Sequence, residues 1–559
     1  MSAQTGTHSL PPPPPQSRGM SRVRGQVAYW KSEPNPILIR ELKQSTRLTR
    51  TPFILMSVTA MTALLMCSIG GLASLSLDPA RTGIAIFHTF FSVAYFVVTL
   101  AGPALASNSI ASEREGRTWE ALLLTGLGPG IIARGKFFAA LTNIAMYIVM
   151  LAPVGALPFL FGGVSAIEVV MAFVWLFLIA SLSVAFGLAL SSKMDSLRSA
   201  IVVTLLFTFV LSPTFYLTFG VGGSSAAHEI WPTVSQGPPV WLPTAYARAP
   251  FSGLYVLLLV VLPVLAVVLP SWFLYEVTVA NLTSITDDRS TGIRRWFVVT
   301  SLLVTVPLAI GSARTQHAGA GAAMALYAGL LLFMALVFCG EPIGPSRRVI
   351  RDWDTRGVSA LQRFLGPGIV RAQMLLVGQG TATIAIFAAV AIAAITLDGG
   401  TDADRQCIGV VVYASYAVGF LLFTCGLAAW ARARTNAPGA ARGIVLAALF
   451  LSSAGPWIVA AMAGVALRSD HDRALLIAAP SPFYLFQVSE RLLREPTAIS
   501  PPVLGALIAA AAWGLLGVSL LGRAALKCRG VIAAHEKALS ESEAILRRED
   551  EEMAAAAAS

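Results

Sequence analysis

Apolar stretches of roughly 20 residues, free of lysine and arginine, recur along almost the whole chain. An α-helix needs about 20 mainly apolar residues to cross a hydrocarbon core about 30 Å thick. We therefore predict an all-α, polytopic membrane protein. Its twelve membrane-spanning helices are expected at about 52–77, 83–107, 137–161, 169–190, 199–221, 251–279, 296–313, 319–339, 372–397, 407–430, 443–466 and 501–522.

The placement of basic residues predicts the orientation of these spans. Loops on the cytoplasmic side of a membrane carry an excess of lysine and arginine. With the N-terminus inside, most of the 40 Lys and Arg fall in predicted cytoplasmic segments. We therefore expect both termini in the cytoplasm and the chain in the cell (plasma or inner) membrane.

Composition narrows the class of protein further. The chain of 559 residues is 56% hydrophobic and 12% charged, whereas soluble domains carry about 25% charged residues. An ordinary water-soluble enzyme is therefore excluded. The net charge of +11 is interpreted as basic cytoplasmic loops, with no nucleic acid as a partner. Five cysteines without a CxxC pair indicate neither a disulfide framework nor a zinc site.

The predicted spans contain few ionisable side chains. Glu276 is their one carboxylate and His88 their one histidine. Transporters that move protons or sodium ions along side chains retain several such groups in spite of the cost of burying them in lipid. We therefore expect the driving energy to come from outside the membrane.

A hexapeptide repeat divides the spans into two sets. Leu127–Ile132 (LGPGII) recurs at Leu365–Val370 (LGPGIV), each time just before a third span. This favours two tandem six-helix halves, 51–295 and 296–522, with a disordered Pro-rich segment 1–28 before them and a charged cytoplasmic tail 523–559 after them. Proline and glycine should end one helix and let the next begin at an angle; the residues concerned are Gly128, Pro129, Gly130, Gly366, Pro367 and Gly368.

Residues 29–50 are predicted to contain an amphipathic helix in the headgroup layer. Its basic residues recur at spacings of three and four, which places them on one helical face. Such a face would attract anionic lipid. The charged residues of this segment are Arg40, Glu41, Lys43, Arg47 and Arg50.

The loop between the second and third predicted spans combines mixed charges with apolar anchors. Trp119, Leu122 and Leu123 can hold a short helix at an interface, while charged neighbours suit docking of a soluble partner.

Two segments resemble the ABC-2 family of ATP-binding-cassette export permeases: NPILIRELKQSTR before the first span and IASEREGRTWEALLLTGLGPGIIARGK after the second. The likeness is clearest over 29–295. It implies an interfacial connecting helix, a coupling helix after span two, and a separate ATPase dimer as partner. It also implies that the ATPase contact includes Glu113, Arg114, Glu115, Arg117, Thr118 and Glu120. No counterpart of the RELKQ helix precedes 296, so 296–522 is either a second permease half or an added module.

No cofactor or catalytic site is expected in this chain. Gly130–Lys136 matches the GxxxxGK spacing of a phosphate-binding loop, but Phe137 replaces the Ser or Thr that holds magnesium. ATP would therefore be bound by the partner subunit. Alternatives to the exporter permease are a twelve-helix ion-coupled transporter and a non-transporting membrane scaffold. The sequence leaves open the substrate and whether one chain or a homodimer forms the pathway.

Overall fold

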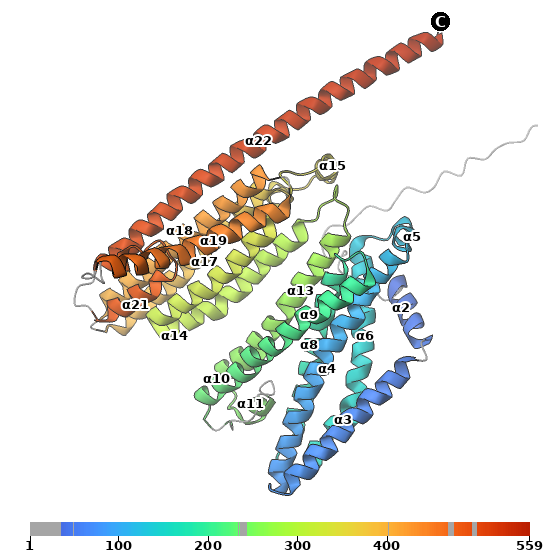
Figure 1. Ribbon diagram of the computed structural model, residues 1–559, viewed down its shortest axis with the longest axis vertical. Helices are drawn as coiled ribbons and strands as arrows, with labels where there is room; N and C mark the ends of the chain where they lie inside the picture. The colour runs from blue at the N-terminus through green and yellow to red at the C-terminus, as the bar shows by residue number, and fades with distance from the viewer. Residues whose placement is uncertain are drawn as a thin grey trace, which may run out of the picture. The chain divides into compact units, whose positions relative to one another are not determined.

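The structure is a computed structural model that describes residues 35–47, 50–232, 234, 243–400, 402–435, 437–467, 475–494 and 500–558. All regular elements in these ranges are helices (Figure 1). Eleven helical stretches among them are long and apolar enough to cross a membrane. The prediction of an all-α, multi-pass membrane protein is confirmed at this level. The predicted disordered segment 1–28 lies outside the described residues.

The chain forms two compact units, Met1–Pro250 and Phe251–Ser559. The boundary predicted from the sequence, at 295/296, stays a prediction. The helices of the first unit are α2 (Pro36–Arg47), α3 (Arg50–Ser74), α4 (Pro79–Glu115), α5 (Trp119–Leu124), α6 (Pro129–Gly155), α7 (Leu157–Phe161), α8 (Ala166–Ser191), α9 (Leu197–Phe215), the π-helix η1 (Tyr216–Val221), α10 (Gly222–Ile230) and α11 (Pro243–Arg248).

Helix α4 is the centre of the first unit, because α3, α6, α8 and α9 all pack against it. Its aromatic side chains Phe90, Phe91 and Tyr95 are buried. The Tyr95 hydroxyl donates a hydrogen bond to the backbone carbonyl of Ser212 in α9 over 2.7 Å. Apolar packing and a few polar contacts therefore hold the spans together, as is usual inside membranes.

The second unit consists of α12 (Gly253–Tyr255), the π-helix η2 (Val256–Val261), α13 (Leu262–Leu282), α14 (Thr291–Phe338), α15 (Arg347–Arg356), α16 (Ala360–Phe364), α17 (Ile369–Asp398), α18 (Ala403–Arg434), α19 (Pro438–Leu467), α21 (Tyr484–Arg494) and α22 (Pro501–Ala558). Helix α22 continues from the last predicted span into the predicted charged tail without interruption.

Helix α14 is a hairpin of two helical segments. Gln316 breaks it with φ 48° and ψ −125°. A straight helix would separate Phe297 from Phe338 by about 60 Å at 1.5 Å per residue, yet their ring centroids lie 6.3 Å apart. The two segments correspond to the spans predicted at 296–313 and 319–339. This explains why eleven stretches are found where twelve spans are predicted.

Helix α18 is the centre of the second unit and packs on α14, α17, α19 and α22. Glycine permits its closest approach to α22. A Cβ atom on Gly426 would lie 2.2 Å from the carbonyl oxygen of Gly517, and one on Gly419 would lie 2.2 Å from that of Ala510. The central helix is thus the second span of the first unit but the fourth span of the second predicted half, a difference that simple duplication does not explain.

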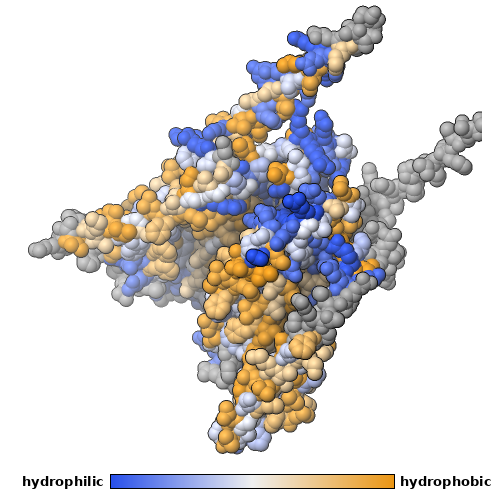
Figure 2. Space-filling view, turned by 45° about the vertical axis from the view of Figure 1, so that its right-hand side comes forward, coloured by the Kyte–Doolittle hydropathy of each residue, from blue (hydrophilic) through white to orange (hydrophobic). Residues whose placement is uncertain are grey.

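The outward surface of both units is apolar. Phe53, Met61, Phe209 and Phe450 are each more than 70% exposed, and Figure 2 shows this kind of surface in orange. Water would disfavour so large an apolar area, whereas lipid would cover it without cost. The exposed apolar surface therefore agrees with a membrane environment.

We expect Gly426→Ala to destabilise the protein by roughly 1–3 kcal/mol, because the added methyl group collides with the backbone of α22 and helices must separate. Gly378→Ala is the matched control: it also lies within a helix, but nothing stands within 4 Å of the position of its Cβ. Thermal unfolding in detergent measures both. If Gly426→Ala and Gly378→Ala had the same melting temperature, the close packing of α18 on α22 would be contradicted.

Candidate functional site

Helices α4, α5 and α6 are joined by two tight turns. Helix α4 ends at Glu115 and is capped by Gly116, and Arg117 adopts φ 54° before α5 begins. After α5, Gly126 adopts φ 74°, a conformation that glycine adopts at little cost. Gly128 then precedes α6, whose first residue is Pro129. The short helix α5 is therefore held between two longer helices by two turns, of which the glycine at 126 favours the second.

Helix α2 packs directly on the beginning of α6. The Asn35 side-chain amide donates to the carbonyl of Ile131 over 2.9 Å, and Ile37 is 3% exposed. A Cβ atom on Gly135 would lie 2.8 Å from the Cβ atom of Ile37. A glycine at 135 is therefore needed for α2 to approach α6 this closely.

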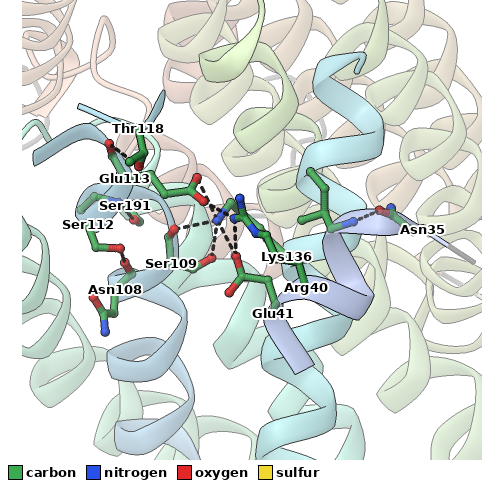
Figure 3. Close-up of polar contacts among 12 residues, drawn as sticks. Asn35, Arg40, Glu41, Asn108, Ser109, Ser112, Glu113, Thr118, Lys136 and Ser191 are labelled. Carbon is green, nitrogen blue, oxygen red and sulfur yellow. Dashed lines mark hydrogen bonds and ion pairs between the residues drawn. The ribbon is translucent and has the colours of Figure 1, made fainter. Parts of the chain in front are cut away.

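A buried lysine links α2, α4 and α6 (Figure 3). The side chain of Lys136, on α6, is 0% exposed. Its Nζ atom lies 3.1 Å from Glu41 Oε1 on α2 and 3.1 Å from Glu113 Oε2 on α4. It also donates to the backbone carbonyl of Ser109 over 2.7 Å. Arg40 pairs with both Glu41 and Glu113. We call Arg40, Glu41, Ser109, Glu113 and Lys136 the lysine junction.

The charges of the lysine junction balance one another. Two cations face two carboxylates, so no net charge is left in this partly buried place. Burial opposes ionisation of Glu41, but the charge of Lys136 and the hydrogen bonds from Arg40 and Lys136 hold the pKa of Glu41 below its usual value. Glu41 is therefore ionised at neutral pH and available to compensate Lys136.

The residues predicted to contact an ATPase divide into an inner and an outer group. The inner group consists of Glu113, Arg114 and Glu115, whose side chains contact other residues of the same chain. Glu113 belongs to the lysine junction, and Arg114 lies 3.6 Å from Asp195. The Glu115 carboxylate accepts a hydrogen bond from the Leu197 amide over 2.8 Å, at the first residue of α9. These side chains hold the loop in place.

The outer group is open to a partner. Arg117, Thr118 and Glu120 are exposed, and Leu124 on the same short helix is 87% exposed. Thr118 also donates through its amide to the Glu113 carbonyl over 3.0 Å. An exposed apolar side chain with charged side chains around it suits the docking of a soluble partner. We call Arg117, Thr118, Glu120 and Leu124 the α5 surface.

The structure contains only part of the basic helical face that is predicted for residues 29–50. Arg40 is engaged by carboxylates of the chain, whereas Lys43 is exposed. Arg47 is the last residue of α2, and Arg50 is the first residue of α3, so Arg50 does not belong to the same helix as the other four. The side chains of Arg47 and Arg50 lie outside the described part of the chain.

The second copy of the Gly-Pro-Gly repeat surrounds a buried arginine. Gly366, Pro367 and Gly368 are buried. Arg294, 0% exposed, lies 2.9 Å from Glu341 Oε2 and donates to the carbonyls of Gly366 over 2.5 Å and Gly368 over 2.9 Å. We call this cluster the arginine junction.

Sequence reasoning missed the two buried cations. The motif pattern presents Lys136 only as part of a false phosphate-binding loop, and it does not single out Arg294. A usable signal existed for Lys136, because a lysine at the start of an apolar span needs a carboxylate nearby. For Arg294, the signal is a basic residue and Glu341 flanking two adjacent spans.

The arrangement joins three helices through buried charges. Within the described ranges, no group of three or more His, Cys, Asp or Glu side chains could hold a metal ion. The lysine junction instead joins the helix that follows the second turn to two other helices. A displacement of α4 at Glu113 would therefore reach α2 and α6.

We expect Lys136→Met to destabilise the protein by roughly 3–5 kcal/mol, because two carboxylates lose the cation that compensates their burial. Lys193→Met, at an exposed lysine that follows α8, is the control and should change little. Thermal unfolding in detergent measures both. If the loss is electrostatic, adding Glu41→Gln and Glu113→Gln to Lys136→Met should recover part of it.

A second prediction concerns pH. Since the pKa of Glu41 in the folded protein lies below 4.5, its contribution to stability is complete above that value and is lost as the pH falls through the folded pKa. Glu41→Gln should therefore lower the melting temperature at pH 7, and the difference from the unaltered chain should shrink below pH 4.5. The exposed Glu120→Gln serves as control. A pH-independent difference for Glu41→Gln would contradict the ion pair.

Compared with models of known protein families and with curated proteins, the chain matches none.

Proposed function

We propose that the chain is the membrane-spanning permease subunit of an ATP-binding-cassette exporter in the cell membrane. A separate ATPase dimer docks on the α5 surface, binds and hydrolyses ATP, and drives the export of a substrate through the helices. The lysine junction is the observation that carries this proposal, since it links the docking element to the helices that must move.

The α5 surface supports docking because it is exposed and yet firmly held. Its four residues lie on or next to a short helix between two turns. Below it, Glu113 and Glu115 attach the end of α4 to α6 and α9. A partner that pushes on a loosely held loop would move only the loop. Because the end of α4 is attached to α6 and α9, the force would be transmitted to these helices.

The lysine junction supports transmission from the docking surface to α2 and α6. Glu113 is separated from Thr118 by one turn of chain, and the Thr118 amide bonds the Glu113 carbonyl. The Glu113 side chain then contacts Lys136, which contacts Glu41. Breaking this buried set of charges would cost several kcal/mol, so α2, α4 and α6 would move together when the ATPase closes.

The hairpin in α14 supports an even number of crossings. Counted as two segments, it raises the eleven candidate stretches to twelve. An even number places both termini on the same side of the membrane. The excess of basic residues in the predicted inner segments then favours the cytoplasm for that side, where an ATP-consuming partner has access to its nucleotide.

We expect the double variant Arg117→Glu with Glu120→Lys to reduce ATPase contact at the α5 surface at least tenfold, which corresponds to about 1.4 kcal/mol. Reversed charges across an interface repel a partner that the original charges attract. The measurement is photo-crosslinking from a benzoylphenylalanine at position 124 to the ATP-binding-cassette ATPase that co-purifies with the chain.

Arg81→Glu is the matched control, because Arg81 is exposed at the opposite end of α4. This variant should crosslink like the unaltered chain. If no ATPase crosslinks to position 124, or if the double variant crosslinks at full yield, the proposed function is wrong.

A further inference from the structure

We propose that Arg432 and Arg442, together with Lys527, bind the phosphate group of an anionic phospholipid. We call these three residues the phosphate site. The inference does not depend on the proposed function, because a lipid would bind here whether or not an ATPase docks elsewhere on the chain. It rests on cations that are fixed in place at the depth of the lipid headgroups and that no carboxylate of the chain compensates.

The end of α14 brings Arg432 and Arg442 together. Arg432, on α18, donates through Nε to the carbonyl of Glu341 over 3.0 Å. Arg442, on α19, donates through Nε to the carbonyl of Leu336 over 3.0 Å. A Cβ atom on Gly340 would lie 2.6 Å from Nη2 of Arg442, so the glycine leaves room for this guanidinium group. Both guanidinium groups are therefore held at one helix end.

Each guanidinium group keeps donors for a ligand. Arg432 also donates through Nη1 to the carbonyl of Thr435 over 2.9 Å, and Arg442 donates through Nη2 to that of Val337 over 3.4 Å. Within the residues that the structure describes, Nη2 of Arg432 and Nη1 of Arg442 have no hydrogen-bond acceptor. Both residues are partly exposed. Guanidinium groups form paired hydrogen bonds with phosphate oxygens, so the remaining donors suit a phosphate group.

Lys527 adds a third cation from α22. Helices α18 and α22 run side by side (Figure 1), and Ala433 of α18 and Cys528 of α22 belong to one buried apolar cluster. The charges of Arg432 and Lys527 both act on the thiol of Cys528. Lys527 is exposed. The lysine therefore lies near Arg432, where a ligand can reach both.

The chain does not compensate the positive charge of the phosphate site. No Asp or Glu occurs between 430 and 442 or between 523 and 535. The carboxylate of Glu341 lies 2.9 Å from Arg294 instead. Among the described residues, no ion pair joins the phosphate site to a carboxylate. The C-terminal end of α14 supplies only about half a negative charge, so about 2.5 positive charges remain for a ligand.

The depth of the phosphate site favours a lipid over a soluble anion. Arg432, Arg442 and Lys527 each lie within five residues of the end of a predicted span, or about 8 Å of helix. The headgroup layer is about 5–8 Å deep on each side. The guanidinium group of Arg434 lies 4.8 Å from the Trp430 ring, and tryptophan is enriched at this level of a membrane. Basic pockets between helices at this depth bind anionic headgroups.

The test measures lipid binding to the full-length chain in detergent by native mass spectrometry. Phosphatidylglycerol is the probe, and phosphatidylcholine, whose headgroup has no net charge, is the comparison. We expect the first phosphatidylglycerol to bind at least tenfold more tightly than the first phosphatidylcholine, which corresponds to about 1.4 kcal/mol. Arg432→Gln with Arg442→Gln should remove this preference. Lys527→Gln should weaken phosphatidylglycerol binding about fivefold, which corresponds to about 1 kcal/mol for one charge.

Arg547→Gln with Arg548→Gln is the matched control, because it removes two charges from exposed arginines of α22 that follow the predicted span by 25 residues or more. It should bind phosphatidylglycerol like the unaltered chain. Melting temperatures check that every variant is folded. If the double variant of the phosphate site unfolds, Lys527→Gln decides, because its side chain forms no hydrogen bond within the described residues.

Four results would overturn the inference. They are equal binding of the two lipids, full phosphatidylglycerol binding by a folded variant of the phosphate site, an equal loss of binding in the matched control, and displacement of the lipid by inorganic phosphate. The last result would indicate a site for a soluble anion. None of the four bears on the ATPase contact at the α5 surface.

Discussion

The burial of Lys136 is the constraint on which the first unit's charged end depends. Removing an ammonium group from water costs several kcal/mol unless carboxylates and carbonyls replace the water. No single helix supplies them: Glu41 comes from α2, while Glu113 and the Ser109 carbonyl come from α4. The lysine therefore fixes how three helices meet. It also explains why Glu113 faces inward, although its place in a charged loop would suit an outer contact.

The second unit meets the same constraint with a different cation. Arg294 carries a planar group with several donors, and its two terminal nitrogens donate to Glu341 and to carbonyls of the repeated segment. The guanidinium group spreads its donors over a planar fork, whereas the ammonium group of Lys136 directs its donors from a single nitrogen. In the first unit, the buried cation lies within the helix that follows the repeat. In the second unit, it binds the chain just before that helix. The surfaces left exposed by this arrangement are short helices, which are therefore rigid as well as accessible.

The sequence predicts the spans well and the junctions poorly, for physical reasons. Span positions follow from local hydrophobicity, which each stretch carries by itself. Even the hairpin in α14 was predicted as two spans, since Arg314 and His317 interrupt the apolar run. The pairing of Lys136 with Glu41 joins residues far apart in the chain, and no local pattern encodes it. The ATPase contact predicted from resemblance stays a prediction. In the structure, the residues of this predicted contact differ in exposure. Arg117 and Glu120 could contact a partner, whereas Glu113 is already bound within the lysine junction.

The two copies of the repeat show how tertiary contacts decide what a short motif becomes. In the first copy the helix begins at Pro129, and Gly128 accepts the early amides through its own carbonyl. In the second copy the helix begins two positions later, at Ile369, because Glu341 and Pro342 accept the amides of Gly368 and Ile369. Arg294 meanwhile donates to the carbonyl of Gly366 and shares that of Gly368 with the Ala372 amide of α17. Gly-Pro-Gly therefore encodes an interruption between helices. The neighbouring charged groups determine the residue at which the next helix begins. They thereby also determine the orientation of the adjoining short helix.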